Sequence, residues 1–183
     1  MRILCLHGYQ TSAKILKQQS KYLRTSLQES LDIEWIIPDA PHKSKGKISP
    51  LVTSIFKPPY YHWYEKNNNY QGLEETIEFL KENINSVDGI LGFSQGACIA
   101  QIIAPIIKPK FVINICGVNY PEYKNILEIP CLNVIGSQDP IKDISELLAL
   151  QYKDSKILYH LGSHSFPPDK PTYQEINNFI KKF

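Results

Sequence analysis

The sequence lacks any apolar stretch long enough to cross a membrane as a helix, so we expect no membrane span. It also lacks a strong excess of one charge, because its 20 basic and 18 acidic side chains give a formal net charge of +2. The lysines are scattered, whereas proteins that bind nucleic acid usually gather them in a patch or stripe. A core-like strand begins at Arg2 and leaves no room for a leader peptide. We therefore expect a cytoplasmic protein without a nucleic-acid partner.

No Cys-x-x-Cys pair occurs in the sequence. The four cysteines lie in separate apolar runs, at Cys5, Cys98, Cys116 and Cys131. Zinc sites and disulfide frameworks need characteristic cysteine spacings, whereas single thiols in apolar runs are common core residues. We therefore predict four buried, reduced thiols in a reducing compartment, and no metal site.

The order of apolar segments predicts the fold class. The 183 residues suffice for one domain with one large core, so we treat 1–183 as a single domain. Continuous apolar runs alternate with helical periodicity, which predicts an α/β fold with about six mostly parallel strands and helices on both faces. Ser12 suits the N-cap of the first helix, and the connection at 117–130 could hold a short helix. We expect strands at 2–6, 33–37, 87–91, 111–116, 131–135 and 157–161, and helices at 12–30, 73–84, 97–104, 141–148 and 173–180.

Residues 41–70 fit neither the helical nor the strand period. The segment contains four prolines, several lysines and a cluster of aromatic side chains. Long loops in compact domains are often lids or binding loops, and so many aromatic residues oppose disorder. We predict an ordered, lid-like segment that covers one edge of the core, forms a wall of a substrate pocket, or does both.

A serine flanked by glycines, Gly92-Phe93-Ser94-Gln95-Gly96, lies between an apolar strand and an apolar helix. This strand–G-x-S-x-G–helix pattern is the nucleophile elbow of α/β-hydrolases. The turn is so sharp that the positions two before and two after the serine tolerate almost no side chain, and glycine meets that need. We therefore predict an α/β-hydrolase fold in which Ser94 is the nucleophile, held at a strained backbone angle above the sheet.

A serine hydroxyl needs a base to take its proton, and histidine serves because its unperturbed pKa is near ~6.5. Ligands of an open α/β sheet bind at the carboxyl ends of its strands. His164 follows the last predicted strand on a loop behind Gly162, and we favour it over His160, which belongs to the strand pattern. His7 precedes Gly8 and suits a structural role that orients its loop. Two further histidines lie in segment 41–70 and have no comparable position, at His42 and His62.

Asp139 comes directly after the fifth predicted strand, so the chain order is serine, acid, histidine, as in α/β-hydrolases. An aspartate there would fix the tautomer of the histidine ring and stabilise its protonated form. Three other aspartates compete from less suitable positions, at Asp143, Asp154 and Asp169.

Two backbone N–H groups are needed to bind the oxyanion of the reaction. One should belong to Gln95, directly after the nucleophile, and the other to Tyr9 in the loop after the first strand, with Gln10 as the next choice. Acyl pockets are mostly apolar with a few polar groups. For the pocket we expect Phe93, Trp63, Tyr64 and Val118.

Five motifs carry a resemblance to a known family: L-H-G-Y at 6–9, W-Y at 63–64, G-F-S-Q-G-A at 92–97, G-S-Q-D-P-I at 136–141 and H-L-G-S-H-S-F-P at 160–167. In these motifs the chain resembles the FSH family of serine hydrolases, small eukaryotic α/β-hydrolases. The resemblance implies a Ser94–His164–Asp139 triad and esterase activity on carboxylic esters. Two departures bear on the size of the acyl pocket: Ser163 stands where the family usually has glycine, and the chain is shorter than most members, particularly after Cys116. The elbow is also similar to that of acyl-protein thioesterases.

We expect a serine esterase that acts on short to medium acyl esters through an acyl-enzyme, without a metal or organic cofactor. A thioester substrate is the first alternative. The second is a hydrolase-fold binding module with little turnover, because a fold does not guarantee an activity. The presence of all three triad residue types at the expected strand ends argues against that module. A peptidase would need a defined side-chain pocket, which the sequence does not indicate.

Overall fold

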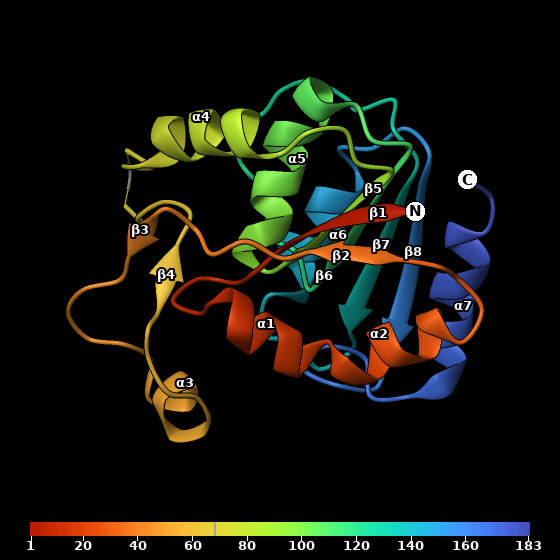
Figure 1. The fold of residues 1–183 in the computed structure, drawn as a ribbon, viewed down its shortest axis with the longest axis horizontal. Coiled ribbons are helices and arrows are strands. Elements are labelled where there is room, and N and C mark those ends of the chain that lie inside the picture. Colours follow the sequence, from red (N-terminus) through yellow and green to blue (C-terminus); the bar gives the residue numbers. More distant parts are fainter. Residues whose placement is uncertain (68) are drawn as a thin grey trace.

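The computed structural model describes residues 1–67 and 69–183 and is built around a six-stranded sheet (Figure 1). Every neighbouring pair in this sheet is parallel, which confirms the α/β fold predicted from the sequence. Its strand order is β2-β1-β5-β6-β7-β8, so the strand that carries the elbow lies near the centre. The strands are β1 (Arg2–Leu6), β2 (Glu34–Ile36), β5 (Gly89–Phe93), β6 (Phe111–Ile115), β7 (Cys131–Gly136) and β8 (Ser155–His160).

Helices cover both faces of the sheet. Adjacent strand residues point to opposite faces, so Ile3 packs in one core cluster and Leu4 in the other. One cluster is closed by α1 (Ala13–Gln19), α2 (Lys21–Gln28) and α7 (Lys170–Ile180), and the other by α4 (Leu73–Asn83), α5 (Gln95–Ile107) and α6 (Lys142–Ala149). Helix α5 is buried nearly all round because it crosses the middle of the sheet, whereas the outer helices keep one polar face.

The first helical segment differs from its prediction in one respect. Ser12 caps it as expected, because the Ser12 Oγ accepts the N–H of Ile15 at 3.3 Å. The predicted single helix at 12–30, however, is divided at Ser20, whose hydroxyl donates to the carbonyl of Leu16 at 2.6 Å. Serine hydroxyls that bond four residues back bend helices, which accounts for the break. In the connection at 117–130 the structure has turns and no helix.

The described part of segment 41–70 has secondary structure that its sequence period did not indicate. It contains β3 (His42–Lys43), α3 (Pro50–Ile55) and β4 (Tyr61–His62), and β3 and β4 form a small antiparallel sheet. Of the predicted lid-like segment, residue 68 lies outside the described residues. Figure 1 shows α3 projecting from the side of the domain, beyond the short β3–β4 sheet.

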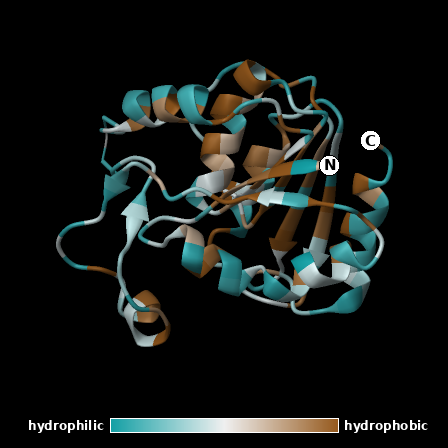
Figure 2. Cartoon of the chain, in the orientation of Figure 1, coloured by the Kyte–Doolittle hydropathy of each residue, from teal (hydrophilic) through white to brown (hydrophobic). Residues whose placement is uncertain are grey.

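Apolar residues concentrate in the inner strands of the six-stranded sheet and in α5, and the outer helices are mostly hydrophilic (Figure 2). Helix α3 forms a separate apolar spot away from this core. Its Leu51 and Ile55 side chains are 72% and 65% exposed, which is unusual for large hydrophobic residues so close in sequence. Within the described part of the chain, no helix has the length and apolar character that a membrane span requires.

Candidate active site

Ser94 lies in the tight turn between β5 and α5, with φ 54° and ψ −117°. Three backbone hydrogen bonds fix this strained residue: its N–H donates to Ile115 O at 3.0 Å, and its carbonyl accepts from Ala97 and Val118 at 3.0 and 3.2 Å. A non-glycine residue in this conformation persists only where its surroundings enforce it. The predicted elbow geometry is therefore present at Ser94.

The two flanking glycines have a steric reason. A Cβ atom at Gly92 would lie 2.6 Å from the backbone nitrogen of Ala97, at the start of α5. A Cβ at Gly96 would lie 2.5 Å from the Leu6 carbonyl carbon and 2.8 Å from the His7 carbonyl oxygen, so it would collide with β1. Glycine at both positions lets strand and helix approach closely enough to hold the serine between them.

His164 and Asp139 meet Ser94 above the carboxyl ends of the strands. The Nδ1 of His164 is 2.8 Å from Asp139 Oδ2, and its Nε2 is 3.0 Å from Ser94 Oγ. Because the carboxylate only accepts, Nδ1 carries the proton, and Nε2 is left to accept from the serine hydroxyl. The other Asp139 oxygen accepts the N–H of Ile141 at 2.9 Å, and the Asp139 side chain is fully buried. The residues are thus arranged for proton transfer from the serine to an oriented imidazole.

The remaining histidines have other surroundings. His7 is completely buried: its Nε2 accepts the N–H of Ala40 at 3.0 Å, and its Nδ1 lies 2.9 Å from Gly8 O. Burial lowers the pKa of His7 to about 4, so it is neutral at pH 7. It holds the loop after β1, the structural role expected from the sequence. His160 is buried at the end of β8 and accepts the N–H of Gly162 at 3.1 Å.

The two histidines of segment 41–70 stack on each other across the β3–β4 sheet. The ring centroids of His42 and His62 are 5.6 Å apart. His42 is hydrogen bonded to Gly72 O at 2.8 Å, and His62 contacts Glu65 at 3.2 Å. Asp169, one of the competing acids, caps α7 through the N–H of Thr172 at 2.9 Å. His42, His62 and Asp169 thus have structural contacts of their own, and their positions require no role at Ser94.

Cys116 lies beside the proton-transfer group, a feature that the sequence did not reveal. Its sulfur and one ligand atom each of Asp139 and His164 lie within 4.8 Å of one another, a spacing at which a metal could bind. The chemistry fits a metal poorly, because burial raises the pKa of the Cys116 thiol to about 12 and the thiol faces Ser165 O at 3.4 Å. The histidine Nδ1 is already hydrogen bonded to the carboxylate. A protonated thiol that packs against the pair describes this group better.

Two candidate oxyanion donors lie next to Ser94. Gln95 begins α5, so its N–H belongs to the first turn, where helical N–H groups lack an intrahelical acceptor. Gly8, in the loop that carries Tyr9, approaches so closely that a Cβ there would lie 3.4 Å from Ser94 Cβ. Among residues 1–67 and 69–183, the backbone N–H groups of Tyr9 and Gln95 have no hydrogen-bond acceptor. Both are therefore available to a ligand at Ser94.

A cavity of about 520 Å³ opens at Ser94 and His164. Phe93 lines it, and the centroid of the Phe93 ring lies 5.3 Å from that of the His164 ring. One wall comes from α3 and the residue that follows it, which contribute Leu51, Val52, Ile55 and Phe56. The lining also includes Tyr9, Gln10 and Lys66. This volume lies within the usual range of small-molecule sites.

Of the four residues suggested for the acyl pocket, the structure brings only Phe93 to this cavity. Trp63 is fully buried, and its indole N–H donates to His7 O at 2.8 Å. The Tyr64 hydroxyl donates to Cys98 Sγ at 3.2 Å inside the core. The backbone N–H of Val118 donates to Ser94 O at 3.2 Å, and Val118 is not among the residues that line this cavity.

The Gln95 side chain explains why Trp63 and Tyr64 are held in the core. Its Oε1 accepts the N–H of Trp63 at 3.0 Å, and its Nε2 donates to Tyr64 O at 2.8 Å. The aromatic pair therefore anchors segment 41–70 to the elbow helix, while α3 supplies the cavity wall. The sequence signal for that wall was the run Pro50 to Phe56, where proline suits a first helical turn and apolar residues follow.

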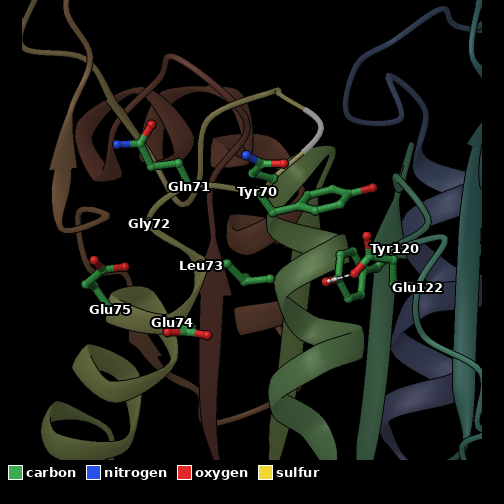
Figure 3. Close-up of a pocket in the computed structure, with 9 residues that line it drawn as sticks. Tyr70, Gln71, Gly72, Leu73, Glu74, Glu75, Tyr120 and Glu122 are labelled. Carbon is green, nitrogen blue, oxygen red and sulfur yellow. Dashed lines mark hydrogen bonds between the residues drawn. The ribbon is translucent and has the colours of Figure 1, made fainter.

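A second cavity, of about 580 Å³, lies at the start of α4 and contains neither Ser94 nor His164 (Figure 3). Three carboxylates line it, from Glu74, Glu75 and Glu122, and the Tyr120 hydroxyl donates to Glu122 at 3.0 Å. Among the described residues that line this second cavity, none is a serine, cysteine or histidine, so it lacks a nucleophile–base pair like that at Ser94.

Known proteins with similar sequences or folds are serine hydrolases and esterases. The family described as "Serine hydrolase (FSH1)" matches residues 1–176. "Esterase CG5412" of Drosophila melanogaster is 27% identical, over 99% of this chain and 74% of its own. "Family of serine hydrolases 3" of Saccharomyces cerevisiae is 26% identical, over 98% of this chain and 83% of its own. Among solved structures, esterase PE8 superposes with a TM-score of 0.68 at 17% identity, over 99% of this chain and 91% of that one, which shows the α/β-hydrolase fold. With the family matched over nearly its whole length, this chain belongs to the FSH1 family of serine hydrolases.

Proposed function

We propose that this serine hydrolase cleaves carboxylic esters with Ser94 as nucleophile, His164 as general base and Asp139 as the residue that orients the base. The observation that carries the proposal is the continuous hydrogen-bonded path from Ser94 Oγ through the His164 ring to Asp139, with distances of 3.0 and 2.8 Å. The names of its relatives in Drosophila melanogaster and in human, "Esterase CG5412" and "Esterase OVCA2", support an ester as substrate.

The reaction proceeds in two halves. Ser94 Oγ attacks the ester carbonyl carbon while His164 Nε2 takes its proton, and the imidazolium then protonates the departing alcohol. Water next attacks the acyl-enzyme, with His164 again as the base, and the acid leaves as Ser94 regains its proton. Asp139 keeps the proton of the neutral ring on Nδ1 and stabilises the imidazolium between these steps.

The oxyanion of each tetrahedral intermediate would be bound by the backbone N–H groups of Tyr9 and Gln95. Their lack of an acceptor among the described residues supports this role. Preorganised donors of this kind contribute about 3 kcal/mol each to the transition state. The strained Ser94 backbone and the close approach at Gly8 favour the two donors converging on one oxygen.

The acyl group would lie against Phe93 and the α3 side chains Leu51, Val52 and Ile55, so segment 41–70 acts as a pocket wall anchored by its aromatic pair. The cavity of about 520 Å³ suits short to medium acyl chains. An acyl thioester would fit the same geometry, because the attack and the oxyanion are unchanged. Matched oxygen and sulfur esters of one acyl chain distinguish the two by their kcat/KM.

We further propose that residues 1–183 act as one hydrolase domain in a reducing compartment such as the cytoplasm. All four cysteines are free and buried, which supports a reducing compartment.

Ser94→Ala tests the nucleophile, with Ser49→Ala as a matched control. Ser49 lines the same cavity, but the His164 Nε2 is hydrogen bonded to Ser94 and not to Ser49. On p-nitrophenyl esters Ser94→Ala should lose turnover by about 10⁶, as serine removal does in subtilisin, and should lose labelling by a fluorophosphonate. Ser49→Ala should keep both. If Ser94→Ala matched the wild type in turnover and labelling, the proposal would be refuted. A wild-type protein that hydrolyses no ester or thioester would favour a binding module.

A further inference from the structure

Lys66 gives the Ser94 cavity a single positive side chain. Its residue lines the cavity together with Ser94 and His164, and its Nζ lies 4.8 Å from the centroid of the Tyr9 ring. Tyr9 belongs to the loop that carries a proposed oxyanion donor, so the ammonium group is tethered near the reacting centre. A lysine over an aromatic face is held there without a fixed counterion, and it remains able to bind an anion.

Among the residues that the structure describes, no carboxylate lines this cavity. Besides Lys66, its ionisable members are Tyr9 and His164. The carboxylate of the adjacent Glu65 is paired with other residues: it contacts His62 at 3.2 Å and accepts the Tyr9 hydroxyl at 3.0 Å. Among the described residues, Lys66 has no ion-pair partner. The Lys66 residue is exposed to solvent, so an anion entering the cavity can reach it.

Segment 41–67, which contributes α3 and Lys66 to the cavity, has an excess of positive charge. Residues 41–67 contain five lysines and one glutamate, and that glutamate is the paired Glu65. A cluster of one sign of charge at a cleft raises the local concentration of ligands of the opposite sign. The cavity in Figure 3 is the reverse case, because it is lined by Glu74, Glu75 and Glu122 and has no lysine among its lining residues. Of these two cavities, the one that contains Ser94 thus carries the lysine and the other carries the carboxylates.

We infer that the preferred substrates are acyl esters that also carry an anionic group, a carboxylate or a phosphate, and that Lys66 binds this group. The inference rests on the proposed esterase function and specifies its substrate class. The apolar part of such a substrate would lie along α3 and Phe93, while the anion would lie at Lys66. Lys66 is therefore a specificity-determining residue, and the cleavage itself does not require it.

The test compares matched neutral and anionic esters. One pair, p-nitrophenyl hexanoate and mono-p-nitrophenyl adipate, differs by a carboxylate at the end of the acyl chain. A second pair, phenyl hexanoate and 4-carboxyphenyl hexanoate, differs by a carboxylate on the alcohol side. The enzymes are the wild type, Lys66→Met, Lys66→Arg and the control Lys57→Met. Lys57 belongs to the same positive segment but does not line the cavity.

For at least one pair, the wild type should have a higher kcat/KM for the anionic ester than for the neutral one. Lys66→Met should lower kcat/KM for that anionic ester about tenfold by raising its KM, as expected for loss of one charge-assisted hydrogen bond. The neutral ester should change less than about twofold, because it makes no ionic contact with Lys66. Lys66→Arg should keep the preference, and Lys57→Met should lower it only slightly. Raising the ionic strength to 1 M, where the Debye length is about 3 Å, should weaken the wild-type preference.

Two results would overturn the inference in distinguishable ways. In the first, neutral esters are hydrolysed through Ser94, but the wild type does not prefer the anionic ester, or Lys66→Met lowers kcat/KM equally for both esters of a pair. Lys66 then has only a structural role beside Tyr9. If the wild type hydrolyses no ester and Ser94 resists the fluorophosphonate, the esterase proposal fails first, and the substrate class fails with it.

Discussion

Gly96→Ala should disable the enzyme without touching any reacting group. Gly96 lies in the first turn of α5, where the helix crosses β1. An added Cβ would lie 2.5 Å from the Leu6 carbonyl carbon and 2.8 Å from the His7 carbonyl oxygen. Both are backbone atoms, one in the last residue of β1 and one in the residue that follows it, so no side-chain rotation can make room. Either the helix start or β1 must move.

The size of the effect follows from this overlap. Ordinary carbon contacts begin near ~3.5 Å, so the helix start must shift by roughly 1 Å. Overpacking of this kind costs about 1–3 kcal/mol of stability. Ser94 is the residue before α5, so the same shift displaces its hydroxyl from the His164 Nε2, which is 3.0 Å away. A displacement of ~1 Å at a reacting centre costs about 10² in rate.

Gly46→Ala is the control for substitution of a glycine as such. Gly46 has φ +81°, and a Cβ there would meet no atom within 4 Å. This variant should lose about 1 kcal/mol through backbone strain and keep its kcat. Urea unfolding and p-nitrophenyl ester turnover measure the two effects in all three proteins. If Gly96→Ala matches wild type in both stability and kcat, the steric account of the elbow is wrong.

Three further predictions follow from the same structure. Asp139→Asn should keep the fold by circular dichroism but lower kcat by about 10⁴, as the equivalent change does in a serine protease, and a loss below tenfold would argue against Asp139. His7 has its pKa lowered to about 4 from 6.5, so the unfolded chain binds a proton that the native chain excludes. Its contribution should reduce the free energy of unfolding by about 3 kcal/mol as the pH falls from 6.5 to 4, and His7→Gln should show a shallower pH slope in urea titrations. The Cys116 thiol, with a pKa of about 12, should resist iodoacetamide at pH 7.5 while activity is retained, and rapid alkylation with inactivation would show that it is a reactive thiolate.

Patterns local in sequence were sufficient to predict the fold class and the sharp turn that carries Ser94. Apolar runs of strand length fix which segments can be buried in a parallel sheet, and glycines two residues on either side of Ser94 fix the turn. The positions of Asp139 and His164 after strands followed from the rule that strand ends meet at one edge. The same reasoning missed the break at Ser20, because a hydroxyl that bonds back to Leu16 leaves the hydrophobic spacing unchanged.

The tertiary structure alone decided which residues surround Ser94, Asp139 and His164. Trp63 and Leu51 are both apolar residues of segment 41–70, yet the first is buried by bonds to Gln95 and His7, and the second lines the cavity. Composition cannot separate them, because the difference depends on partners 32 to 56 residues away along the chain. The neighbourhoods of Cys116 and Lys66 likewise arise from loops that meet only after the sheet is assembled. The sequence determined which residues could react, and three-dimensional packing decided what lies close enough to shape their substrate.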